Sequence, residues 1–140
     1  DGAGMAFNDP LSQSGWAAPY QHFAENGLRI GELRESGSHV ESGRSVADGF
    51  SDFAALDALS WEMIRRYEDF AADLIEVDRT APTPALPFIT AHKRDPMPLA
   101  NAFSRAIFDL SPADRDVLFL QDILDIRQTA YLAIPIPPAP

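Results

Sequence analysis

The sequence predicts an all-α fold, a small helical bundle built on one long amphipathic helix. In residues 50–79, apolar side chains recur at alternating spacings of three and four from Phe53 to Val77, interrupted only by Ser60, and this spacing is the period of one face of a helix. A second amphipathic stretch with helix-start chemistry follows at residues 111–133. The short run with strand character at residues 28–33 has no convincing partner strand, so a sheet is not expected.

The predicted elements fall into three regions. Residues 1–49 are expected to form an extended arm and loop region, which includes a short helix at residues 16–26. Residues 50–133 are expected to form the helical domain, which includes a shorter helix at residues 97–110. Residues 134–140 are proline-rich and are expected to form an extended tail, because proline interrupts helices and inner strands.

Local signals mark the ends of these elements. Pro19 suits the first turn of the short N-terminal helix and Gly27 suits the position after its end. Five glycines and four serines punctuate residues 27–49, which is typical of a long loop. Four prolines in residues 80–96 predict a stiff extended connection. Ser111 precedes a proline and an acidic residue in the pattern of a helix N-cap.

Charge and composition exclude several classes of protein. Eleven Lys and Arg residues stand against 21 Asp and Glu residues, a net charge of −10. Without a basic stripe, direct nucleic-acid binding is not expected. There is no cysteine, and no apolar run is long enough for a membrane span. No signal peptide is visible, so the expectation is a soluble chain, cytoplasmic or inside a particle or large complex.

No set of residues predicts catalysis, a metal site or a cofactor. His22 and Glu25 have the i, i+3 spacing of two metal ligands on a helix, but a metal site needs three or four ligands and no second pair appears. His39 and His92 lie in stretches predicted to be irregular. No nucleophile-elbow or phosphate-loop pattern is present, so an enzyme is not expected.

One stretch has a residue pattern similar to that of a known motif. Residues 110–122 begin with Leu110, a capping serine and a proline, and this run resembles the opening of the helix-turn-helix region of small sigma factors. The resemblance covers about a dozen residues of common helix-start chemistry. The glycine-containing turn and the recognition helix of that family do not follow, so DNA recognition is not expected.

The leading functional hypothesis is a non-enzymatic structural, assembly or accessory subunit of a larger complex, such as a virus or phage particle or a multi-subunit machine. It rests on helices that carry more apolar surface than they can hide and on terminal arms with spaced apolar side chains. Its partners would be other protein chains, in a homo- or hetero-oligomer. The predicted partner-binding residues are Phe7, Leu11, Trp16, Tyr20, Phe23, Trp61 and Ile136.

Two alternatives stand beside this hypothesis. The first is an acidic regulatory or adaptor protein that binds a basic protein through a sigma-factor-like or nucleic-acid-mimicking surface. It predicts binding that weakens steeply with salt, whereas assembly contacts would be apolar and insensitive to salt. The second is a small metal-dependent enzyme that uses His22 and Glu25.

Overall fold

The computed structural model describes all of residues 1–140, and its contacts divide the chain into two compact units. Unit 1 contains Asp1–Pro82 and Pro135–Pro140, and unit 2 contains Thr83–Ile134. This division differs from the boundaries after residues 49 and 133 that the sequence favours. We describe each unit by itself.

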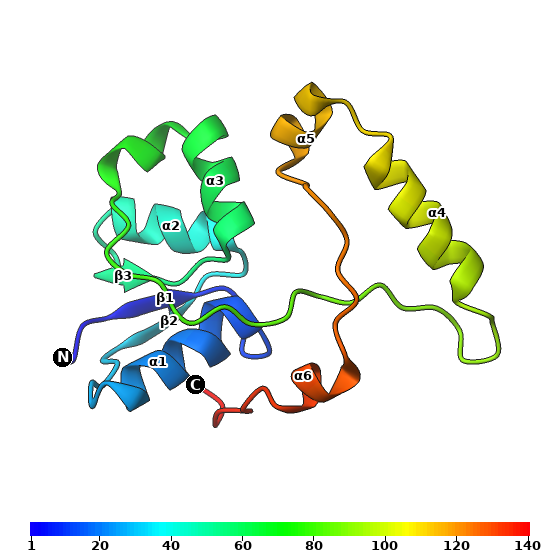
Figure 1. Cartoon of the computed structure of the whole chain (residues 1–140). Helices are drawn as coiled ribbons and strands as arrows, with labels where there is room; N and C mark the ends of the chain where they lie inside the picture. Colours follow the sequence, from blue (N-terminus) through cyan, green and yellow to red (C-terminus); the bar gives the residue numbers. More distant parts are fainter. The chain divides into compact units, whose positions relative to one another are not determined.

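Unit 1 is built on a parallel sheet of three short strands (Figure 1). The strand order is β2-β1-β3, where β1 is Met5–Phe7, β2 is Leu33–Glu35 and β3 is Phe53–Ala54. In the register, Met5 pairs with Leu33 on one side and with Phe53 on the other. All three residues of β1 are buried, as expected for a central strand covered on both faces.

Helices follow each strand of unit 1. A π-helical turn, η1 (Gln13–Ala17), continues directly into α1 (Ala18–Glu25); α2 (His39–Ala47) follows β2, α3 (Ala58–Tyr67) follows β3, and the 3-10 turn η2 is Asp69–Asp73. In Figure 1, α1 lies on one face of the sheet and α2 and α3 lie on the other. Unit 1 is therefore a small α/β layer structure.

Aromatic contacts fix α1 against the sheet. The Phe23 ring of α1 stacks on Phe53 of β3, with ring centroids 5.1 Å apart. The Trp16 ring lies 5.7 Å from that of Phe7 in β1. Trp16 Nε1 also donates a hydrogen bond of 2.9 Å to the Pro138 carbonyl, which ties the C-terminal residues to unit 1. Burial of the Phe7 and Trp16 rings stabilises this packing.

Unit 2 contains three helices joined by extended chain: α4 (Met97–Phe108), α5 (Pro112–Leu118) and α6 (Gln128–Leu132). Ile107 is the one buried apolar side chain of this unit. The rings of Phe88 and Phe103 stack with centroids 4.4 Å apart. Across the whole chain, no helix combines the length and the apolar character needed to span a membrane.

The prediction of an all-α bundle is wrong, because the structure contains the parallel sheet of β1, β2 and β3. These strands have three, three and two residues, too short to show a period of two in the sequence. They are separated by helices, so their pairing is a long-range property that no local window contains. The predicted arm and loop at residues 1–49 hold two of the strands and also α1 and α2.

The predicted long helix at residues 50–79 is also wrong. Its first part is β3, and Asp57 then caps the shorter helix α3. At Glu68 the backbone becomes extended, with φ −113° and ψ 123°, and η2 follows. The apolar spacing between Phe53 and Val77 is therefore shared by several elements, and it does not belong to one helix.

The stretch at residues 111–133 is not one helix either. α5 stops at Phe119, whose φ of 52° is in the left-handed region that ends helices, and α6 starts only at Gln128. The Ser111 N-cap is present as predicted, since its hydroxyl accepts a hydrogen bond from the Asp114 N–H. α4 coincides with the helix predicted at residues 97–110.

Candidate functional site

Three loops of unit 1 meet at one edge of the sheet. Each follows the carboxyl end of a strand and leads into a helix: β1 into η1, β2 into α2, and β3 into α3. The carboxyl ends of parallel strands lie at the same edge, and ligands of open α/β sheets bind there. We call the polar side chains of these loops the carboxyl-edge cluster, which consists of Asn8, Ser12, Ser14, Ser38, His39 and Asp57.

The loop after β1 is shaped by close packing around Gly15. Ser12 is the N-cap of η1, and its hydroxyl accepts a hydrogen bond of 3.0 Å from the Gly15 N–H. A Cβ atom on Gly15 would lie 1.8 Å from Asn8 Oδ1, so only glycine allows this approach. Asn8 Oδ1 is buried and has no hydrogen-bond partner, which is uncommon away from functional sites.

The loop after β2 is joined to the loop after β1 by backbone hydrogen bonds. The Ser36 N–H donates to the Phe7 carbonyl at 2.8 Å, and the Gly37 N–H donates to the Asn8 carbonyl at 3.1 Å. Gly37 has a φ of 86°, which a side chain would strain. The following residue, Ser38, is the N-cap of α2 and accepts from the Glu41 N–H. These bonds fix where α2 begins.

The loop after β3 contributes one carboxylate, that of Asp57. It is the N-cap of α3, and its Oδ1 accepts a hydrogen bond of 2.9 Å from the Ser60 N–H. Its Oδ2 accepts a hydrogen bond of 2.6 Å from the Ser60 hydroxyl. Burial alone would raise the pKa of Asp57, but the two Ser60 hydrogen bonds and the nearby His39 ring outweigh it and lower that pKa below its ordinary value.

The His39 ring joins the three loops. Its Nε2 atom lies 3.0 Å from the Ser14 hydroxyl of the first loop and 3.2 Å from Asp57 Oδ2 of the third. Its Nδ1 atom is buried without a hydrogen-bond partner. Burial lowers the pKa of His39, and the Asp57 carboxylate and the Ala55 carbonyl oppose this effect only in part. The ring is therefore neutral near pH 7.

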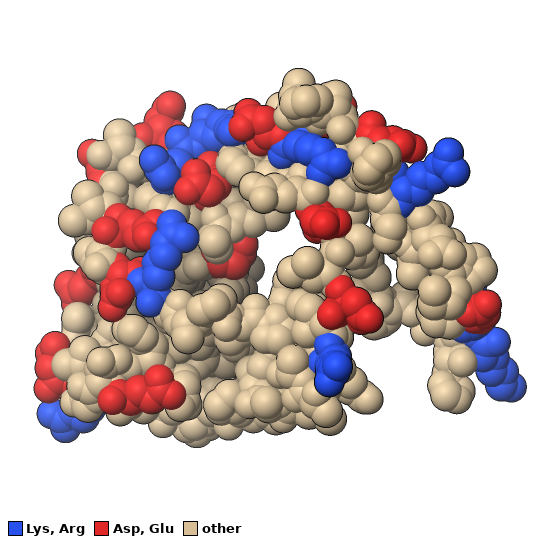
Figure 2. Space-filling model, in the orientation of Figure 1, with Lys and Arg blue, Asp and Glu red and all other residues tan.

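The cluster has the chemistry of an oxyanion site. The first N–H groups of a helix have no partner within the helix and carry a partial positive charge. Two helical segments, Gln13–Glu25 and α2, begin at this edge behind serine N-caps. None of the six clustered residues is Lys or Arg, and Figure 2 shows acidic and basic side chains interspersed over the face it presents. An anion would therefore be held by dipoles and hydroxyl groups.

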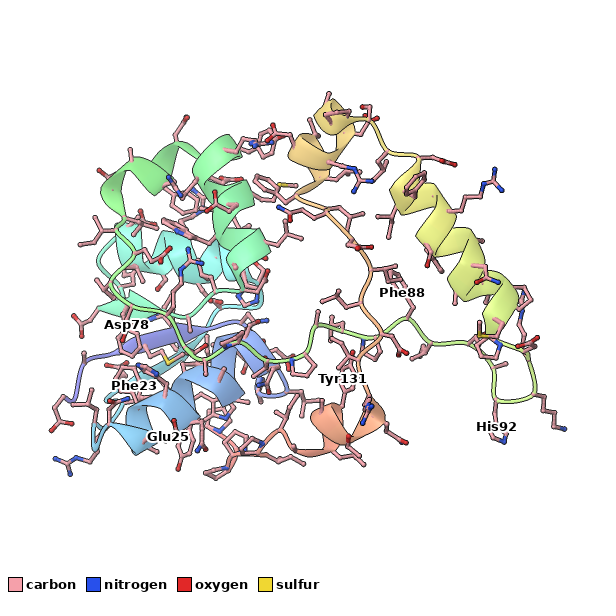
Figure 3. The ribbon with its side chains drawn as sticks, in the orientation of Figure 1. Phe23, Glu25, Asp78, Phe88, His92 and Tyr131 are labelled. Atoms are coloured by element: carbon pink, nitrogen blue, oxygen red, sulfur yellow. The ribbon has the colours of Figure 1, made fainter.

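His22 and Glu25, the two residues of the metal-dependent alternative, have separate partners. His22 Nε2 contacts Asp78 Oδ2 at 3.1 Å, whereas Glu25 accepts a hydrogen bond from Gln21. Figure 3 shows Glu25 near the end of α1, and His92 belongs to the loop before α4 in unit 2. Nowhere in residues 1–140 do three or more His, Cys, Asp or Glu side chains gather as metal ligands would.

The predicted partner-binding residues lie in different environments. Phe7 and Trp16 are only 4% and 3% exposed and belong to the core of unit 1. Leu11 and Ile136 are each 95% exposed, and Leu11 directly precedes Ser12 of the cluster. The remaining three are half-buried: Tyr20, Phe23 and Trp61.

Sequence reasoning missed every residue of the carboxyl-edge cluster. The usable signal is a repeated order of elements, in which a short apolar run is followed by a polar loop and a capping residue. Met5–Phe7 is followed by Ser12, Leu33–Glu35 by Ser38, and Phe53–Ala54 by Asp57. One such sequence pattern is a weak signal by itself. The three patterns form one site only because the parallel sheet brings their loops to the same edge.

Comparison with known protein families gives one match. The family described as "ABC transporter, phosphonate, periplasmic substrate-binding protein" matches residues 1–131, which is most of the chain. No curated protein and no solved structure matches the chain significantly.

This match contradicts the predicted functions. A structural or assembly subunit of a virus, a phage or a multi-subunit machine is a different kind of protein from a substrate-binding protein, so that hypothesis is wrong. The acidic regulatory or adaptor protein and the small metal-dependent enzyme do not fit the family either. The hypothesis failed because it rested on two long helices, at residues 50–79 and 111–133, which the structure replaces by shorter elements.

Proposed function

We propose a function for this chain from one premise: it belongs to the family of periplasmic substrate-binding proteins of phosphonate ABC transporters. We infer that unit 1 binds the anionic head group of a phosphonate at the carboxyl-edge cluster. The observation that carries the proposal is the meeting of Ser14, His39 and Asp57, from three separate loops, at the edge where two helical segments begin.

The donors of the cluster match the acceptors of a phosphonate. A –PO3 group offers three strongly accepting oxygens and no apolar surface. The hydroxyls of Ser12 and Ser38 each accept from a backbone N–H, so their own O–H groups are free to donate outward. Further donors come from the first backbone N–H groups of η1 and α2. Hydrogen bonds to an ionised group are about twice as strong as neutral ones.

Binding without chemical conversion is the activity we assign. The family is described as one of substrate-binding proteins, and binding alone requires no change to the substrate. The strongest nucleophile candidate of the cluster, Ser14, shares its histidine with a carboxylate on the same ring nitrogen. A catalytic triad needs that carboxylate on the opposite nitrogen.

We also propose that this chain contacts other proteins, namely the other chains of an ABC transporter. A substrate-binding protein of an ABC transporter passes its substrate to other chains of that transporter, and the family description places this step in the periplasm. Leu11 is the best exposed of the apolar residues beside the cluster, and it would contact such a chain. Ile136 is equally exposed and is a second candidate.

Titration with methylphosphonate tests the proposal directly. We expect heat of binding in calorimetry, and a change in the fluorescence of Trp16, which lies in η1 beside the cluster. Ser14→Ala and Ser12→Ala should each weaken binding about tenfold, because each removes one donor to a charged group. Ser104→Ala, an exposed serine of α4 in unit 2, is the matched control and should leave the affinity unchanged.

Competing anions define the specificity. Inorganic phosphate has the same charged oxygens and should compete with methylphosphonate, whereas acetate should compete poorly because it has only two acceptor oxygens. The proposal fails if methylphosphonate gives no saturable signal with the wild-type chain. It also fails if Ser14→Ala and Ser104→Ala bind methylphosphonate with equal affinity.

A further inference from the structure

The protonation of the His39 Nε2 atom depends on two neighbours, the Asp57 carboxylate and the Ser14 hydroxyl. Asp57 Oδ2 lies 3.2 Å from Nε2, and the negative charge of this carboxylate stabilises a proton on that atom. The Ser14 hydroxyl can either donate to an unprotonated Nε2 or accept from a protonated one. Which of these states exists decides whether the Ser14 proton is used inside the protein or is free for a ligand.

The geometry favours the proton on Nε2. The negative charge of Asp57 stabilises a proton on Nε2, whereas an unprotonated Nε2 would place its lone pair 3.2 Å from Asp57 Oδ2. Nδ1 makes no geometric hydrogen bond. The Ala55 carbonyl also acts on the ring, but it raises the pKa of His39 less than the Asp57 carboxylate does, so the charge of Asp57 decides where the proton lies. Because burial lowers the pKa of His39, the neutral ring carries only one proton.

We propose that Asp57 acts as a positioning residue for the ligand site, by holding the proton of neutral His39 on Nε2 so that the Ser14 hydroxyl donates to the bound anion. This inference rests on the proposed phosphonate binding and assigns a role within it. In this arrangement Ser14 Oγ accepts from the ring, and its O–H is left for a phosphonate oxygen. Asp57 repels a bound anion by its charge, but it also leaves the Ser14 hydroxyl free to donate to that anion.

Asp57 is held in place for this role by α3 itself. Both of its oxygens accept hydrogen bonds from Ser60, one from the backbone N–H and one from the hydroxyl. The carboxylate therefore has one orientation, and Oδ2 is the atom that meets the ring. Asn at this position keeps the helix cap, because Asn and Asp cap equally well, but it loses the charge that selects the Nε2 proton.

A double-mutant cycle with methylphosphonate separates this role from simple electrostatics. Removing a like charge near an anion should tighten binding, so electrostatics alone predicts tighter binding by Asp57→Asn. The positioning role predicts the opposite, a loss of about tenfold. In a Ser14→Ala background, where no hydroxyl remains to be oriented, Asp57→Asn should cause no further loss.

The outcomes decide between the two accounts. An equal loss on Asp57→Asn in both backgrounds, or tighter binding in the wild-type background, overturns the positioning role and leaves the binding site itself intact. No saturable binding of methylphosphonate by the wild-type chain would instead overturn the proposed function. Circular dichroism of each variant shows whether α3 is retained, and Ser60→Ala, which loosens the carboxylate, should give a smaller loss in the same direction.

Nitrogen-15 NMR of the histidine ring gives a second readout that needs no ligand. We expect His39 of the wild-type chain at pH 7.5 to show the chemical shifts of a protonated Nε2 and a bare Nδ1. Asp57→Asn should shift the population toward the Nδ1–H form, whereas Ser14→Ala should leave the Nε2–H form dominant. A wild-type ring that carries its proton on Nδ1 would overturn the inference.

Discussion

Unit 1 and unit 2 differ in how much of their apolar side chain is buried. In unit 1, Met5 and Ala6 have no exposed surface and Ile64 is only 1% exposed. In unit 2, the best covered apolar side chain is Ile107, at 8%, while Leu86 and Ile89 are 93% and 89% exposed. The sheet provides unit 1 with a surface that helices can cover on both faces, and unit 2 contains only helices and extended chain.

This contrast teaches where a ligand site can be built. A binding cluster needs its side chains held within a fraction of an ångström by rigid elements. Unit 1 has them, since hydrogen bonds from β2 and its loop fix the loop after β1, and three N-caps fix the helix starts. Unit 2 has one side-chain N-cap, Ser111, and few buried contacts behind it.

The largest expected difference comes from matched core substitutions. Ile64→Ala removes a side chain that is almost fully buried in unit 1 and should destabilise that unit by about 2–5 kcal/mol. Ile107→Ala removes the best buried side chain of unit 2 and should cost well under half as much, because few neighbours surround the space that it leaves. Urea unfolding followed by tryptophan fluorescence measures unit 1 alone, since Trp16 and Trp61 are both in it.

Circular dichroism on the same samples measures the helices of both units. Equal losses for the two variants would contradict the contrast between the units. A tryptophan transition moved by Ile107→Ala would show that the stability of unit 1 depends on unit 2.

A smaller difference is expected from matched N-cap substitutions. Ser38 caps α2 and Ser111 caps α5, and each hydroxyl accepts a 3.1 Å hydrogen bond from the third residue after it. Ser38→Ala should destabilise unit 1 by about 1 kcal/mol, the usual value of a capping serine. Ser111→Ala should lower only the helix signal in circular dichroism, because α5 has few tertiary contacts through which its loss could spread. A shift of the tryptophan transition by Ser111→Ala would contradict this expectation.

The same contrast explains what the sequence could predict. α4 was predictable because its apolar spacing, its Pro98 at the first turn and its length are all local properties. The Ser111 cap was predictable for the same reason. β1 was not, because Met5–Phe7 is an ordinary apolar triplet until Leu33 and Phe53 pair with it from distant parts of the chain.

The candidate site was unpredictable for a related reason. Ser14, His39 and Asp57 are separated by 25 and 18 positions, and no motif spacing links them. These three side chains meet only because the three strands are parallel and end at one edge. The apolar stripe at residues 50–79 was misleading in the same way, since β3, α3 and η2 use its side chains for different neighbours.

The smallest expected effect is a pH dependence that belongs to unit 1 alone. The pKa of His39 in the folded chain is below its ordinary value of 6.5. As the pH falls through 6.5, the unfolded chain therefore binds a proton before the folded chain does. Stability should therefore be full well above pH 6.5 and fall as the pH drops through 6.5 toward 5. The pKa of Asp57 is also lowered, from an ordinary value of 3.8, so its stabilising contribution is still complete at pH 5 and is lost only in stronger acid.

Urea midpoints measured by tryptophan fluorescence should decline between pH 7.5 and pH 5 in the wild-type chain and stay flatter in His39→Gln. His92→Gln, which replaces an exposed histidine of unit 2, should keep the wild-type decline. If His39→Gln also kept it, the acid sensitivity would come from a group outside the carboxyl-edge cluster.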